Sequence, residues 1–227
     1  MTDQAIRLHH VPGSRSFRVL WMLEELGLAA ELSCYAIRDG SLRAPEVLAV
    51  TPAGRVPALE IDGQAIFESG AIVQYLAETR PAAGLERPPG HRDRARYLQC
   101  LHFAETQASL IENLNLSHVF LRPPARPSAA VLKVTTARLR GTVQALEGML
   151  DADGFLLGGF SAADVMLGFN LWAVPRYVRL DPFPQVRAYR DRLAARPAFA
   201  AARAKDGVAD FYDRDFYEVP PDEGAER

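Results

Sequence analysis

Cysteine is scarce in this chain of 227 residues, which contains only Cys34 and Cys100. The two lie far apart, and neither belongs to a Cys-x-x-Cys pair or to the ligand spacing of a metal site. A disulfide framework and a metal centre are therefore not expected. We expect both cysteines to be small buried apolar side chains in a reducing compartment.

An excess of charge of one sign is also lacking. The chain has 26 Lys and Arg against 28 Asp and Glu, for a net charge of −2. Such a balance gives no basic surface for nucleic acid or for an anionic membrane, so neither is expected as a partner. No apolar run approaches the roughly 20 residues needed to cross a bilayer, and the polar residues 1–4 do not resemble a signal peptide. We expect a cytoplasmic protein.

The first 80 residues contain alternating strand and helix patterns. Apolar residues recur on one helical face until Gly27, and Asp62-Gly63 is typical of a hairpin turn. Strands are expected at 6–9, 31–37, 58–61 and 65–67, and helices at 16–26 and 69–79. This order resembles thioredoxin and predicts an α/β domain over residues 1–82.

The rest of the chain is predominantly helical and follows a linker rich in proline and glycine at 80–90. Ser161 and Asp164 have the spacing of a capping box, so we interpret Asp164 as structural and not catalytic. The charged tail from Asp206 is expected to be a surface extension. Helices are predicted at 92–116, 129–150, 161–172 and 184–195, within an all-α domain over residues 91–227.

Two short segments of the first half have the pattern of a binding site for a small peptide. In one, Pro57 opens an apolar strand, and a cis Val56-Pro57 bond would turn the Val56 amide outward as an edge for an extended ligand. In the other, Glu68 and Ser69 begin a helix whose free amides favour an anion, so Glu68 could bind an ammonium and Ser69 a carboxylate. Each segment alone is equally compatible with a turn proline and an ordinary helix cap.

The α/β half, these two segments and the helical second half resemble, in this order, the glutathione S-transferase family. The resemblance covers nearly the whole chain and includes Phe-Ser-Ala-Ala-Asp at 160–164. Residues 9–21, His-His-Val-Pro-Gly-Ser-Arg-Ser-Phe-Arg-Val-Leu-Trp, are most similar to bacterial and fungal members that use a serine near the first helix.

The resemblance implies a homodimeric detoxification enzyme that takes glutathione as co-substrate together with a small electrophile, without a metal. It also implies which residues bind glutathione. Val56, after which Pro57 begins the strand, would hold the cysteinyl backbone, Arg55 would reach the glycine carboxylate, and Glu68 and Ser69 would hold the γ-glutamyl end.

Activation of glutathione requires a group that stabilises its thiolate, because a free thiol has a pKa of about 8.5. A hydrogen bond to a charged group contributes roughly 1.5–3 kcal/mol, and one pKa unit corresponds to about 1.4 kcal/mol, so one hydroxyl nearly suffices. Ser14, in the turn after the first strand, is the best candidate, and Ser16 is the second because it could instead cap the helix. Both could also have only these local roles. The absence of tyrosine and cysteine from this segment argues against tyrosine-type activation and against a mixed disulfide.

The acceptor pocket is expected between the domains, where the first loop faces His102, Glu105 and Ser109. The spacing of these three places them on one helical face, which could equally be solvated. His9 and His10 alternate across a strand, so at most one of them faces the site, and a structural role is expected for both.

Three functions are compatible with these residues: conjugation of glutathione to electrophiles, glutathione-dependent reduction of peroxides, and non-catalytic binding or regulation. The hydroxyl close to Glu68 and Ser69 favours an enzyme that conjugates glutathione.

Overall fold

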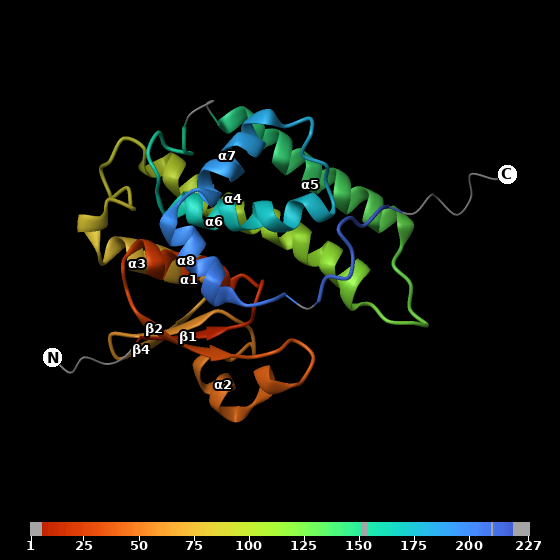
Figure 1. Ribbon diagram of the computed structural model, residues 1–227, viewed down its shortest axis with the longest axis horizontal. Helices are drawn as coiled ribbons and strands as arrows, with labels where there is room; N and C mark the ends of the chain where they lie inside the picture. The colour runs from red at the N-terminus through yellow and green to blue at the C-terminus, as the bar shows by residue number, and fades with distance from the viewer. Residues whose placement is uncertain (1–5, 151–153, 210, 220–227) are drawn as a thin grey trace.

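The computed structural model describes residues 6–150, 154–209 and 211–219, in which a four-stranded sheet is followed by a helical layer (Figure 1). The strands lie in the order β2-β1-β3-β4. β1 (Ile6–His10) pairs in parallel with β2 (Ala30–Cys34) and antiparallel with β3 (Ala58–Ile61), and β4 (Gln64–Phe67) pairs antiparallel with β3. This mixed sheet with its flanking helices confirms the predicted thioredoxin-like α/β fold.

Helices cover both faces of the sheet. α1 (Ser16–Glu25) and α3 (Ser69–Glu78) lie between the sheet and the helical layer, and α2 (Pro45–Val50) lies on the opposite side (Figure 1). Because α1 contacts the sheet on one side and the later helices on the other, it is buried on nearly every face. Trp21, at 0% exposure, is a core residue.

The second half is all helical, as predicted. α4 (Arg94–Asn115) packs on α5 (Ala129–Met149) and α6 (Ala162–Ala173), and α7 (Pro184–Ala194) and α8 (Pro197–Asp206) complete the layer. Single turns of helix lie at Ser41–Arg43, Pro81–Ala83, Leu116–Phe120 and Val174–Arg176. None of the helices in the described ranges is long and apolar enough to cross a membrane.

Asp164 closes a capping box at the start of α6, which supports its structural interpretation. Its carboxylate accepts from the backbone N–H groups of Ser161 and Leu156, at 2.8 and 3.1 Å, and from the Tyr189 hydroxyl at 2.8 Å. Burial raises the pKa of this carboxyl, while these donors oppose the shift. The residue therefore joins α6 to α7 within the core.

Several expectations are wrong. Cys34 is exposed, although Cys100 is buried, and the second strand ends at Cys34 without reaching residue 37. α8 has no counterpart among the predicted helices. Phe211 and Tyr217 of the tail are 7% and 3% exposed, because they pack against the helical core, so the described part of the tail is no mere surface extension.

Candidate functional site

A cleft of about 730 Å³ separates the sheet half from the helical half. One wall comes from the loop between β1 and α1 and from the segments near residues 40 and 55, and the other comes from α4, α6 and the tail. The lining residues are Val11, Gly13, Ser14, Arg15, Ile37, Gly40, Leu42, Arg43, Ala53, Gly54, Arg55, Val56, Ala108, Ile111, Glu112, Asn115, Leu116, Phe120, Phe169, Asn170, Ala173, Phe211 and Tyr212. The lining is thus largely apolar, and it also contains three arginines, Arg15, Arg43 and Arg55, and one carboxylate, Glu112.

Val56 and Arg55 reach the cleft from the segment before β3. The Val56-Pro57 peptide bond is cis, as expected, and Pro57 itself is buried. Pairing between β3 and β1 begins at Ala58, opposite His9, so Val56 precedes the ladder. Val56 lines the cleft, and a backbone outside the ladder is one to which an extended peptide could pair.

Ser14 and Ser16 have different environments. Ser14 lines the cleft and is partly exposed, whereas Ser16 is 0% exposed behind it. The two hydroxyl oxygens are 2.8 Å apart, and the Ser16 N–H donates to Ser14 Oγ at 3.2 Å. Ser16 Oγ also lies 2.8 Å from His10 Nδ1 and accepts from the Val11 N–H at 3.2 Å. Only Ser14 can therefore contact a ligand in the cleft directly.

The loop that carries Ser14 is tied to the end of α8. His10 Nε2 is 3.0 Å from the Asp206 carbonyl oxygen and 3.4 Å from Asp206 Oδ1. The same Oδ1 accepts from the Gly13 N–H at 3.1 Å. His9 points elsewhere, with its ring nitrogens 2.8 Å from the Tyr35 hydroxyl and 2.9 Å from Glu60 Oε1. Both histidines are thus within the fold, and neither lines the cleft.

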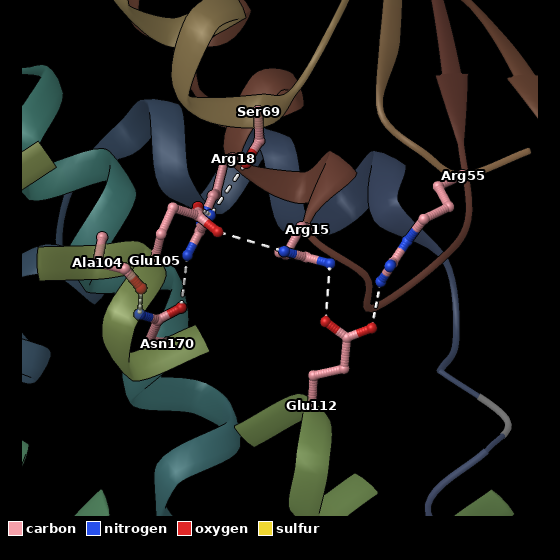
Figure 2. A network of polar contacts seen from close by, with 8 residues as sticks. All are labelled: Arg15, Arg18, Arg55, Ser69, Ala104, Glu105, Glu112 and Asn170. Atoms are coloured by element: carbon pink, nitrogen blue, oxygen red, sulfur yellow. Dashed lines mark hydrogen bonds and ion pairs between the residues drawn. The ribbon is translucent and has the colours of Figure 1, made fainter. Parts of the chain in front are cut away.

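A buried arginine lies beside the start of α3. Figure 2 shows Arg18, at 0% exposure, contacting Glu105 and donating to Ser69 Oγ at 3.0 Å and to Asn170 Oδ1 at 2.8 Å. Ser69 is itself 4% exposed, while Glu68 is exposed and has a φ of +74°. Neither Glu68 nor Ser69 lines the cleft described above; the arginine connects their helix to α4 and α6 instead.

The network continues along the cleft through two carboxylates of α4. Arg15 donates to Glu105 at 3.2 Å and to Glu112 at 3.1 Å, and Glu112 also pairs with Arg55 (Figure 2). Burial would raise the pKa of Glu105, but the guanidinium groups of Arg18 and Arg15 outweigh it and hold that pKa below its ordinary value. Glu105 is therefore ionised at neutral pH, and a chain of alternating charges runs from Arg18 to Arg55.

None of the three α4 residues considered for the acceptor pocket lines the cleft, and for His102 and Ser109 the alternative of a solvated face agrees with the structure. His102 and Ser109 are exposed and do not line the cleft, and Glu105 turns to the two arginines. The wall of α4 consists instead of Ala108, Ile111, Glu112 and Asn115.

The roles of Arg18 and Glu112 were not predicted, although the spacing of charged residues in the sequence indicates them. Arg15, directly before α1, and Arg18 in its first turn are three residues apart, and Glu105 and Glu112 are seven apart on α4, so each pair lies on one side. Two complementary pairs of this kind indicate ion pairs between the two segments. Among the residues that the structure describes, no three His, Cys, Asp or Glu side chains gather as a group that could hold a metal ion.

Comparison with known proteins identifies the family. Residues 13–79 match the model of the glutathione S-transferase N-terminal domain. The chain is 34% identical to a maleylacetoacetate isomerase of Pseudomonas aeruginosa, over 82% of this chain and 90% of that protein. A glutathione transferase from Methylococcus capsulatus has a similar structure, with a TM-score of 0.76 and 31% identity over 89% of this chain and 98% of its own. A sphingomonad glutathione S-transferase, solved with glutathione, superposes with a TM-score of 0.74 at 29% identity, over 89% of this chain and all of its own. The chain therefore belongs to the glutathione S-transferase family.

Proposed function

We propose that this protein is a glutathione transferase, which binds glutathione beside Val56 and conjugates its sulfur to a small electrophile. The observation that carries the proposal is the position of Ser14. Ser14 is a partly exposed residue on a cleft wall, with Val56 and Arg55 on the same wall. A solved relative of the same fold holds glutathione.

The glutathione backbone would extend along the segment before β3. Val56 would pair with the cysteinyl residue through its main chain, because that backbone precedes the strand ladder. Arg55, already at the cleft, would bind the glycine carboxylate and exchange part of its contact with Glu112. Glu68 and Ser69 would bind the γ-glutamyl ammonium and carboxylate at the start of α3, where the helix dipole favours an anion.

Ser14 would activate the thiol. A hydrogen bond from its hydroxyl to the sulfur anion contributes about 1.5–3 kcal/mol, which corresponds to roughly one to two pKa units. The thiolate would then attack an electrophile held against the apolar part of the lining, which includes Ile111, Phe120 and Phe169. A cleft that combines a hydroxyl and arginines with apolar side chains suits a two-substrate reaction.

The decisive measurement is a titration of the thiol of bound glutathione in the parent protein and in Ser14→Ala. We expect the parent to hold a thiolate at neutral pH, and Ser14→Ala to lose about ten- to a hundredfold in conjugation rate. The melting temperature should change little, since Ser14 is partly exposed. Full activity in Ser14→Ala together with an ordinary thiol pKa in the parent would contradict the proposal.

One observation favours a second reaction of the same thiolate. The arginines Arg15, Arg43 and Arg55 all line the cleft, and a relative at 34% identity is a maleylacetoacetate isomerase. Addition of the thiolate to an unsaturated acidic acceptor, followed by its release, would isomerise that acceptor without consuming glutathione. Assays with a halogenated aromatic, an organic peroxide and an unsaturated dicarboxylate separate transferase, peroxidase and isomerase activities, and binding without turnover would indicate a regulatory protein.

A further inference from the structure

We infer that the proton of the bound thiol is passed through Ser14 and Ser16 to His10, which acts as the internal base of the site, with Asp206 as its counter-ion. The inference rests on the proposed function, since it requires glutathione sulfur at Ser14. It adds a proton acceptor to a site in which a hydroxyl alone could only stabilise the thiolate.

The four residues form a continuous chain from the cleft to the interior. Ser14 Oγ lies 2.8 Å from Ser16 Oγ, which lies 2.8 Å from His10 Nδ1. His10 Nε2 in turn lies 3.0 Å from the Asp206 carbonyl oxygen and 3.4 Å from Asp206 Oδ1. Ser16, His10 and Asp206 are 0%, 0% and 1% exposed, so only Ser14 meets the cleft.

The acceptors around His10 determine its tautomer. A carbonyl oxygen can only accept, so Nε2 carries a proton whether the ring is neutral or charged. In the neutral ring Nδ1 is an acceptor 2.8 Å from Ser16 Oγ, whereas the Val11 carbonyl oxygen lies 3.2 Å from the same Oγ, so the relay has the Ser16 hydroxyl donate to the nearer acceptor, Nδ1. Ser16 Oγ then accepts from Ser14, and the hydroxyl of Ser14 points inward. In this state Ser14 has a lone pair, not a proton, to offer a ligand.

Transfer of the thiol proton reverses the direction of every hydrogen bond between Ser14 and His10. The S–H bond breaks and its proton goes to Ser14 Oγ, the proton of Ser14 goes to Ser16 Oγ, and the proton of Ser16 goes to His10 Nδ1. Sulfur keeps the electron pair as a thiolate, which now accepts from Ser14, and His10 becomes an imidazolium. When product leaves, the reverse path returns the proton to solvent.

The positive charge formed on His10 lies beside the carboxylate of Asp206. Asp206 Oδ1 faces the imidazolium, and Asp206 Oδ2 is held by Arg203 at 2.5 Å. Arg203 and Asp206 both belong to α8. The other neighbours of His10 are Ser16 of α1 and Cys34 of β2, which is its register partner in the sheet. A buried histidine with a carboxylate on one nitrogen and a hydroxyl on the other is the arrangement of a general base.

The test measures where the thiol proton goes. Glutathione is titrated into the parent protein in two buffers of different ionisation enthalpy at about pH 6.5, roughly two units below the ordinary thiol pKa, while thiolate absorbance is recorded. If His10 keeps the proton, thiolate forms with almost no proton release. Release of about one proton per thiolate formed would overturn the relay and leave the proposed function intact. Failure of glutathione to bind or to ionise would overturn the proposed function instead.

Variants give a second, independent readout. His10→Gln should release about one proton to the buffer per thiolate formed, and at about pH 6.5 its conjugation rate should fall by about a hundredfold, recovering as the pH rises. His9→Gln is the matched control, because it lies on the same strand but contacts Tyr35 and Glu60. Proton release that stays at the parental value in a folded His10→Gln would contradict the inference.

Discussion

Glu68 has a backbone conformation that its residue type rarely adopts, with a φ of +74° and a ψ of 114°. Such a conformation costs roughly 1–3 kcal/mol in a residue other than glycine and persists where the surrounding structure imposes it. Its carbonyl oxygen already accepts from the Ile72 N–H at 3.0 Å, and its side chain makes no capping bond to the helix. The exposed carboxylate is therefore available to a ligand, which is the role the proposal gives it.

Two substitutions distinguish the effect of the Glu68 charge on binding from the effect of its backbone conformation on stability. Glu68→Gln removes the charge alone, and we expect glutathione affinity to fall roughly ten- to a hundredfold at an unchanged melting temperature. Glu68→Gly should bind glutathione as weakly but be more stable by roughly 1 kcal/mol, because glycine tolerates the positive φ. Calorimetric affinities equal to that of the parent in both variants would remove Glu68 from the proposed site.

At the scale of elements, the loop between β1 and α1 holds its place through contact with the chain after α8. Gly13 has a φ of +71°, and a Cβ on it would lie 2.4 Å from the Ala209 Cβ. The Gly13 N–H donates to Asp206 Oδ1 at 3.1 Å. The absence of a side chain at Gly13 thus lets the helical half approach the loop and fix Ser14 at the cleft.

Gly13→Ala tests this contact, and the same substitution at Gly27 is its matched control. Gly27 has a φ of +65°, and a methyl group on it would meet no atom of the described residues within 4 Å beyond its chain neighbours. Gly27→Ala therefore carries only the backbone cost of about 1–2 kcal/mol. Gly13→Ala carries that cost and an overlap of methyl groups, and should lose about 1–3 kcal/mol more, together with conjugation activity. Chemical denaturation measures both variants; equal losses would mean that the loop and the tail move apart freely.

Periodicity predicts elements far better than it predicts what those elements contact. Strands and long helices lie within a few residues of their expected bounds, because one buried face determines the pattern of each. α8 was not predicted because it begins soon after α7 and is rich in alanine, so that the contrast between its buried and exposed faces is weak in the sequence. Ser14 and Val56 lie at the cleft, as local turn chemistry indicates. The partnership of Arg18 with Glu105 joins positions 87 apart, and no local pattern reports such a pair.

At the scale of the whole molecule, the tail completes the cleft. Phe211 and Tyr212 line it, and the Phe211 ring lies 5.9 Å from that of Phe120 across the end of α4. Tyr212 donates to Asn115 Oδ1 at 3.0 Å. Farther along, the Tyr217 N–H donates to the Arg176 carbonyl oxygen at 2.8 Å and anchors the segment to the helical layer. The acceptor end of the cleft therefore depends on Phe211 and Tyr212, which are distant in sequence from the residues of the opposite wall.

Ending the chain after Ala209, so that the contact with Gly13 is kept, should separate acceptor binding from glutathione binding. The truncated protein keeps Asp206, Ser14 and Val56 but loses Phe211 and the other tail aromatics, each worth roughly 3–5 kcal/mol when buried. We expect a lower melting temperature and a KM for the acceptor raised by about tenfold or more, with a glutathione Kd close to the parental one. Tyr217→Ala is the control, since that residue is buried in the tail but does not line the cleft, and it should lower stability with a smaller change in acceptor KM. A truncated protein with the parental acceptor KM would show that the tail forms no part of the acceptor site.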